Sequence, residues 1–194
     1  AVIKVKTGVK KNGILIAQHV EFIFDSGAYG AYRPQGFLVG AHDAPGPYRV
    51  PNCLVEEKYV YTNKMPCGYM RAPGHLQAMF ACESQTDLVA RHLRMDPVEF
   101  RRMNFMHDGD TAPLGEVIAH VKATETLMKA VDASGYGRPK QKNRGRGCAI
   151  ADWVSKGGES YAFIKIDDDG VVTLSSAVTD TGPGIPPEER AAVM

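Results

Sequence analysis

Apolar and polar residues alternate in three segments of the first third of the chain. Residues 3–9 read IKVKTGV, residues 14–29 read ILIAQHVEFIFDSGAY, and residues 54–63 read LVEEKYVYTN. A period of two places one face of each segment against a core and leaves the other face exposed, which predicts β-strands. Lys11-Asn12-Gly13 separates the first two segments and predicts a tight turn that joins them as a hairpin.

Helical spacing replaces this alternation further along the chain. From Ala78 to Met95, apolar residues recur at intervals of three and four, which predicts a helix. Asp96-Pro97 then predicts an N-cap and a first-turn proline for a second helix with the sequence DPVEFRRMNF. A third helix is predicted over residues 124–135, TETLMKAVDASG, with Gly135 as its stop signal.

A basic, turn-rich segment follows, and a second strand pattern comes after it. Residues 137–147 read GRPKQKNRGRG, a composition typical of a linker. The later sequence ESYAFIKIDDDGVVTLSSAVTD predicts another hairpin, with its turn at Asp168-Asp169-Gly170.

Together these elements predict an α+β fold, in which antiparallel sheets carry helices packed on one side. We expect a first block over residues 1–137, a linker over residues 138–145 and a second block over residues 146–194.

Composition narrows the function classes. The chain has 194 residues, 44% of them hydrophobic, and its 23 basic and 22 acidic residues give a net charge of +1. Charge therefore predicts neither a nucleic acid nor an acidic membrane as partner. Four cysteines without a C-x-x-C pair argue against a zinc site or an iron–sulfur cluster built from this chain, and favour a reduced, cytoplasmic protein. No apolar run is long enough to span a membrane, no signal peptide is visible, and the start inside a strand suggests a piece of something longer.

The segment richest in possible chemistry covers residues 66–87, PCGYMRAPGHLQAMFACESQTD. A predicted strand ends before it, a loop carries Gly68, Arg71, Pro73 and Gly74, and a helix follows at once. The unpaired N–H groups and the positive dipole end of that helix would face an anion beside the loop. The planar guanidinium of Arg71 would donate further hydrogen bonds to the same anion. The alternative is a tight turn with a surface arginine, and His75 is expected to be an exposed first-turn residue.

Two carboxylates on the first helix raise a different possibility. Glu83 and Asp87 stand four residues apart, on or near the helical stripe that Phe80 and its neighbours predict to be buried. Buried charges need partners, which either Arg101 and Arg102 on the following helix or the N–H groups of the preceding loop would supply. We expect these carboxylates to be structural braces and not an acid/base pair.

Several of these strings also carry a resemblance to a known family. GPYRVPN, DSGAY, the long string MRAPGHLQAMFACESQTDLVARHLRMDPVEFRRMN and the late TGPG occur in the order and spacing seen in the molybdenum-cofactor subunit of the xanthine dehydrogenase, aldehyde oxidase and carbon monoxide dehydrogenase family. The resemblance covers nearly the whole chain, and residues 1–137 and 146–194 would then be parts of two molybdenum-cofactor-binding subdomains. It implies molybdenum-dependent hydroxylation of an aldehyde or an N-heteroaromatic carbon with oxygen derived from water.

The resemblance also assigns site residues. The loop would approach the molybdenum with Arg71 as the molybdenum-proximal arginine, though not as a direct ligand, and the late glycine turn would support the pterin. The cofactor-binding residues it implies are Met70, Arg71, Ala72, Gly74, Gly182, Pro183 and Gly184. Pro73 would line the substrate site, at the position where xanthine-type members carry a phenylalanine, so xanthine is not the expected substrate.

Other members of the family supply parts that this sequence lacks. Their catalytic glutamate lies toward the far end of the subunit, and their first glycine-rich cofactor segment lies upstream of a start like this one. No catalytic residue is therefore expected within the chain, which would be inactive alone. The resemblance implies iron–sulfur and FAD subunits or domains as partners, a small-molecule substrate and a homo-oligomer.

Two alternatives remain open. Residues 180–189, DTGPGIPPEE, are also similar to the first glycine box of sensor histidine kinases, which would make the chain an ATP-binding module. Pro183 stands where the molybdenum family usually has a glutamine, and this removes a side-chain amide that would bind the pterin. The second alternative is a non-catalytic scaffold domain.

Overall fold

The computed structural model describes residues 1–29, 44–66, 68, 72, 74–113, 115–151 and 161–176. The chain divides into two compact units, Ala1–Trp153 and Val154–Met194. The helices of the described residues all belong to the first unit.

The first unit contains a three-stranded sheet of strands β1 (Val2–Val9), β2 (Leu15–Gly27) and β3 (Asn52–Tyr61), in the order β1-β2-β3. β1 and β2 form the predicted antiparallel hairpin, and Gly13 takes a φ of 90° in its turn. β3 pairs with β2 in parallel, which corrects the expectation of a purely antiparallel sheet. The short connection between β1 and β2 forces antiparallel pairing, but the long connection from β2 to β3 allows the chain to return in the same direction.

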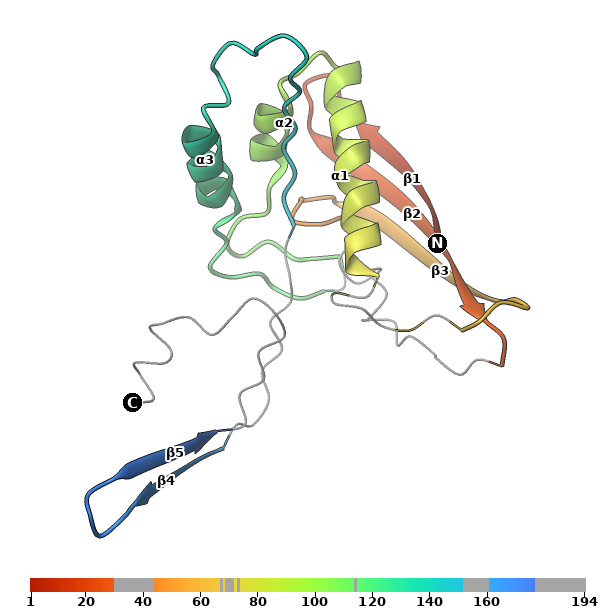
Figure 1. Cartoon of the computed structure of the whole chain (residues 1–194). Coiled ribbons are helices and arrows are strands. Elements are labelled where there is room, and N and C mark those ends of the chain that lie inside the picture. Colours follow the sequence, from red (N-terminus) through yellow and green to blue (C-terminus); the bar gives the residue numbers. More distant parts are fainter. Residues whose placement is uncertain are drawn as a thin grey trace. The chain divides into compact units, whose positions relative to one another are not determined.

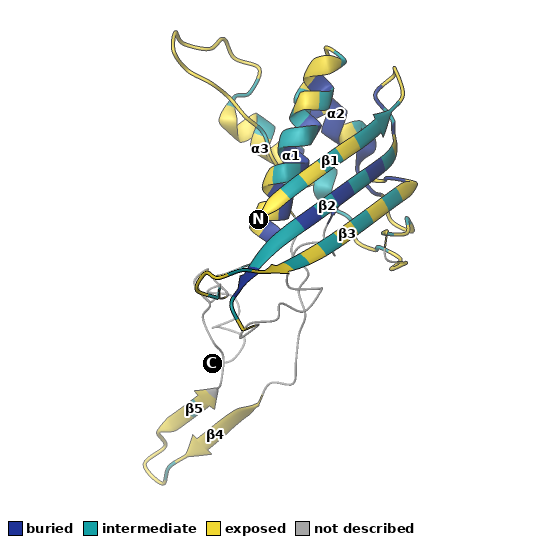
Figure 2. Cartoon of the chain, turned by 90° about the vertical axis from the view of Figure 1, so that its right-hand side faces the viewer, coloured by how far each residue is buried: buried dark blue, intermediate teal, exposed yellow. Residues whose placement is uncertain are grey.

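Strand register separates an inner face from an outer face. Val5, Val20 and Val55 are aligned across the sheet and pack in the core, while Lys4 and Glu21 are paired on the opposite face. Figure 2 shows the sheet from this outer face, with the helices behind it. The predicted alternation is therefore confirmed in all three strands of this sheet.

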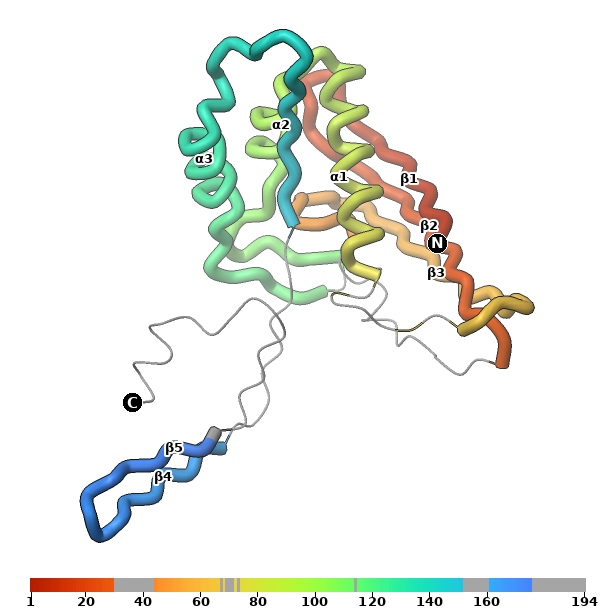
Figure 3. The backbone as a smooth tube through the Cα atoms, in the orientation of Figure 1, coloured from red at the N-terminus to blue at the C-terminus, as the bar shows by residue number. Residues whose placement is uncertain are grey.

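Helices α1 (His75–His92), α2 (Pro97–Asn104) and α3 (Ala123–Ser134) lie on one side of the sheet (Figure 1). The tube in Figure 3 shows the same one-sided arrangement. Asp96 caps α2 because its carboxylate accepts hydrogen bonds from the N–H groups of Val98 and Glu99, at 2.8 and 3.1 Å. Gly135 ends α3 in the left-handed conformation, with a φ of 60°. The α+β class, with helices on one side, is confirmed.

Two hydrophobic clusters form the core of this unit. One lies between the sheet and α1 and contains Val20, Phe22, Ala78 and Met79, together with Ala44 and Cys82. The other joins α2, α3 and the segment around Tyr48; its buried members are Leu15, Tyr48, Val50, Ala90, Val98, Phe100, Phe105 and Leu127. Phe80 is 77% exposed, so its predicted burial is wrong. One helical step of about 100° turns Phe80 away from the buried Met79.

Residues 147–151 belong to the first unit, and Cys148 and Ile150 pack on its second cluster. The boundaries expected at residues 138–145 remain a prediction. Within the described residues, none of the helices combines the length and the apolar composition that a bilayer span requires.

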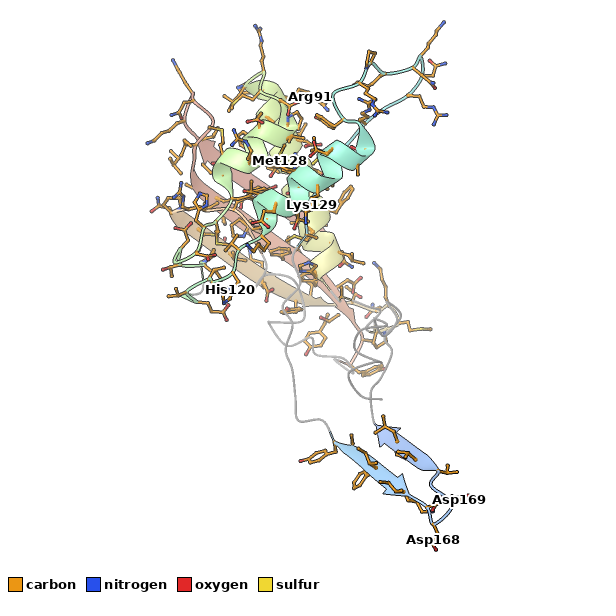
Figure 4. The ribbon with its side chains drawn as sticks, turned by 90° about the vertical axis from the view of Figure 1, so that its left-hand side faces the viewer. Arg91, His120, Met128, Lys129, Asp168 and Asp169 are labelled. Carbon is orange, nitrogen blue, oxygen red and sulfur yellow. The ribbon has the colours of Figure 1, made fainter. Side chains whose placement is uncertain are left out.

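The described part of the second unit is an antiparallel hairpin of β4 (Ala162–Ile166) and β5 (Val172–Ser176). Its turn is the predicted one, because Asp168 and Asp169 lie at the tip and Gly170 has a φ of 83° (Figure 4). The hairpin of the sequence prediction is thus confirmed.

Candidate functional site

The structure describes only part of the site that the sequence predicts. Ala72 and Gly74 are described. Met70, Arg71, Pro73, Gly182, Pro183 and Gly184 lie outside the described residues. That the loop around Arg71 approaches the molybdenum and the late glycine turn supports the pterin therefore stays a prediction. The described part of the site consists of the residues that flank the loop.

The carboxylate of Asp25 joins the end of β2 to the segment that leaves β3. It accepts hydrogen bonds from Thr62 Oγ1 at 2.6 Å, Lys64 Nζ at 2.9 Å and the backbone N–H of Gly27 at 3.0 Å. The bonds from Thr62 and Lys64 lower the pKa of Asp25 to about 2. A charged Asp25 therefore holds the segment that leads into the predicted cofactor loop.

Glycine is required at position 27 by the same approach of the two segments. Gly27 has a φ of 71°, and a Cβ built on it would lie 2.4 Å from the Cα of Pro66. Its carbonyl accepts the N–H of Thr62 at 3.1 Å, and the carbonyl of Lys64 accepts the N–H of Ala28 at 2.9 Å. The DSGAY string thus has a local structural role, namely to clamp the start of the loop.

The loop ends at an uncapped helix N-terminus. Ala72 and Gly74 both have positive φ angles, 49° and 76°, and α1 begins at His75. Gly74 occupies the N-cap position without a side-chain cap, and no acidic residue stands in the first turn of α1. The first backbone N–H groups of α1 are therefore not neutralised by a capping side-chain oxygen, and this end of the helix suits an anionic group.

His75 is 4% exposed, so the expectation of an exposed first-turn histidine is wrong. It is the first member of a stripe of α1 that is buried along the helix. The stripe consists of His75, Ala78, Met79, Cys82, Glu83, Thr86 and Ala90. Intervals of three and four residues connect all of its members, so helical spacing extended back to the glycine loop would have found this burial.

Glu83 on α1 and Arg101 on α2 form a buried ion pair. Arg101 Nε donates to Glu83 Oε2 at 2.9 Å, and the two side chains are 0% and 7% exposed. Arg101 Nη1 lies 2.7 Å from Asp87 Oδ1 and donates to the carbonyl of Pro97 at 3.1 Å. The predicted brace is confirmed, and its cation is Arg101. Arg102 instead pairs with Glu99 on the surface.

Two further donors complete the shell of Glu83. Tyr48 Oη donates to Glu83 Oε1 at 2.5 Å, and the backbone N–H of Ile150 donates to Oε2 at 2.9 Å. Burial and the nearby carboxylate raise the pKa of Tyr48, so its hydroxyl stays protonated as a donor. No local pattern signals either partner, since Tyr48 and Ile150 lie 35 and 67 residues away in sequence.

The brace joins α1 to α2, to the Tyr48 segment and to residue 150. Both oxygens of the buried Glu83 carboxylate accept hydrogen bonds, and such a satisfied group rigidifies the elements that donate to it. It fixes the direction of α1, and with it the position of the uncapped N-terminus that follows Gly74. Neighbouring Cys82 plays no acid/base part, because burial raises the pKa of its thiol to about 12. In the described part of the chain, no group of three or more His, Cys, Asp or Glu residues is arranged to hold a metal ion.

Comparison with known sequences finds a family profile and several relatives. Residues 1–105 match the profile described as "Molybdopterin cofactor-binding domain". The chain is 31% identical to a probable xanthine dehydrogenase subunit of Bacillus subtilis (strain 168), over 94% of this chain and 26% of that protein. It is 39% identical to the nicotinate dehydrogenase large molybdopterin subunit of Eubacterium barkeri, over 68% of this chain and 32% of that protein.

Solved structures have the same fold. An aldehyde oxidoreductase from Desulfovibrio gigas has a TM-score of 0.75 and 26% identity, over 89% of this chain and 20% of that one. Quinoline 2-oxidoreductase from Pseudomonas putida 86 has a TM-score of 0.76 and 25% identity, over 93% of this chain and 26% of that one. The chain thus spans about a quarter to a third of the length of the two curated relatives.

Proposed function

The chain belongs to the molybdopterin cofactor-binding domain family, and on that premise we propose that it forms one wall of the cofactor site of a molybdenum hydroxylase. The enzyme would transfer oxygen derived from water to an aldehyde or to an N-heteroaromatic carbon. The names of the relatives support this substrate range, since they include an aldehyde oxidoreductase, a nicotinate dehydrogenase and a quinoline 2-oxidoreductase.

The observation that carries the proposal is the uncapped N-terminus of α1 behind Gly74. Its first-turn N–H groups and positive dipole end suit the anionic oxygens of a pterin cofactor, so the described residues fit the group. Ala72 and Gly74 would approach the cofactor through their backbones, together with Met70 and Arg71. Pro73 would face the substrate, and Gly182, Pro183 and Gly184 would support the pterin from the second bend. When bound, the cofactor supplies a metal that activates water and accepts electrons.

The chain would work as part of a larger assembly. Hydroxylation with water releases two electrons per turnover, which iron–sulfur and flavin subunits or domains would receive. The catalytic carboxylate would come from outside residues 1–194, so the isolated chain would be inactive. We further propose a homo-oligomeric complex in the cytoplasm.

Cofactor content tests this function directly. The chain would be expressed with its flanking and neighbouring reading frames in a host that makes the molybdenum cofactor. We expect about one molybdenum and one pterin per subunit, and dye reduction that depends on an aldehyde or an N-heteroaromatic compound. Gly74→Ala should lower the molybdenum content several-fold. Gly109→Ala is the matched control, because Gly109 also has a positive φ, 88°, and a Cβ there meets nothing within 4 Å.

Other outcomes would refute the assignment. A purified protein without molybdenum or pterin that binds ATP, and loses ATP when Gly182 is substituted, would favour the ATP-binding module. A protein that binds neither would favour the scaffold domain. Equal molybdenum contents in Gly74→Ala and Gly109→Ala would remove Gly74 from the site.

A further inference from the structure

Within the described residues, the β1 edge of the three-stranded sheet has no neighbouring strand. Among the strands of the described residues, β1 pairs with β2 and with no other strand, so its second edge is open. Figure 2 shows β1 along this border of the sheet. Its outward N–H and C=O groups are a template for one more strand, and only an extended segment can satisfy them in register.

An apolar groove of about 610 Å³ runs beside this edge, between β1 and α1. Ile3 and Val5 line it from the strand, and Leu76, Phe80 and Leu88 line it from the helix. These three helix residues are 63%, 77% and 56% exposed. A helix face in contact with water is ordinarily polar. The apolar residues on this face of α1 are therefore typical of a surface that packs against another protein segment.

The outer side of the same edge is positively charged. Lys4 and Lys6 stand on β1 with their side chains on the outer face, alternating with Ile3 and Val5. Lys4 Nζ lies 2.8 Å from Glu21 Oε2, and Glu21 also receives Lys58, with Nζ 2.5 Å from Oε1. Glu21 and its neighbour Glu56 lie further inward on β2 and β3, so the charged outer-face side chains that an added strand would meet directly are Lys4 and Lys6 of β1.

We propose that the β1 edge and its groove bind a β-strand from the part of the molybdenum subunit outside residues 1–194. That strand would alternate apolar side chains, which enter the groove over Phe80, with acidic side chains beside Lys4 and Lys6. Curated relatives about two to four times longer than this chain offer such a segment, since the matched residues are 94% of this chain but 26% of one relative, and 68% of this chain but 32% of the other. The source of the strand rests on the proposed function, whereas its chemistry rests on the edge and the groove alone.

A peptide probe tests this surface without any cofactor. The probe is a labelled, end-blocked peptide of eight residues that alternates glutamate and valine, matching the eight residues of β1. We expect saturable binding to the 194-residue chain by fluorescence anisotropy, weaker at high salt, and slower amide exchange in β1 but not in β3. Phe80→Glu should weaken binding at least tenfold. Because Phe80 is exposed, this variant should keep the circular dichroism spectrum of the parent.

Matched controls distinguish binding of the probe at this surface from nonspecific hydrophobic binding. Val117→Glu places the same charge on another exposed apolar residue, 70% accessible, and should bind the probe like the parent. A peptide with four valines followed by four glutamates has the same composition and should not bind. The proposal is overturned if Phe80→Glu binds equally well, if the block peptide binds, or if exchange slows in β3 instead of β1. Dimerisation of the chain that Phe80→Glu abolishes would also overturn it, in favour of a second copy as occupant. A negative cofactor assay would leave these results unchanged, so the two failures are distinguishable.

Discussion

Replacing Arg101 by methionine tests the buried brace, because the change keeps an unbranched apolar stem and removes the charged guanidinium group. Arg101 is fully buried and contacts the carboxylates of Glu83 and Asp87 at 2.9 and 2.7 Å. Without it, Glu83 keeps the donors of Tyr48 and Ile150 but no cation. Removal of one partner from a buried pair costs about 3–5 kcal/mol, a large part of the roughly 5–15 kcal/mol that a domain typically has.

Urea unfolding followed by far-ultraviolet circular dichroism measures this loss. With a slope of about 2 kcal/mol per molar urea, the midpoint should fall by about 1.5–2.5 M. Arg102→Met is the matched control, since the adjacent Arg102 is half exposed and pairs only on the surface with Glu99. Its cost should stay below about 1 kcal/mol. Equal midpoints for the two variants would show that the brace does not hold α1, and the reasoning about the helix N-terminus would fall with it.

Two further predictions concern the clamp at the end of β2. Gly27→Ala should destabilise the first unit by about 2–4 kcal/mol in thermal unfolding, because position 27 has a positive φ and the new Cβ would lie 2.4 Å from Pro66. Gly68→Ala is the control: its Cβ meets nothing within 4 Å, so it should change the free energy of unfolding by less than about 0.5 kcal/mol. The second concerns pH: because the folded pKa of Asp25 lies at about 2, below its ordinary 3.8, its contribution is complete above about pH 4 and is lost as the pH falls toward 2. Melting temperatures across that range should therefore fall more steeply for the parent than for Asp25→Asn, and parallel curves would refute the clamp.

Local patterns in the sequence are sufficient for most of the elements and part of the site. Alternation predicts the strands, and the start signal at Asp96 and the stop signal at Gly135 are confirmed by the caps of α2 and α3. The need of a buried carboxylate for a cation likewise predicts the brace from Glu83 to the following helix. These features depend on neighbours within a few residues or on one helical face, and that is why the sequence alone determines them.

Tertiary structure decides what depends on distant segments. The long connection to β3 permits either direction, and only packing against β2 makes the pair parallel. Helix phase relative to the core selects Arg101 over Arg102 and exposes Phe80. Tyr48 reaches Glu83 across 35 residues of sequence. Each of these outcomes depends on which surfaces meet in the folded chain. The spacing of apolar residues along a single helix or strand does not specify that contact.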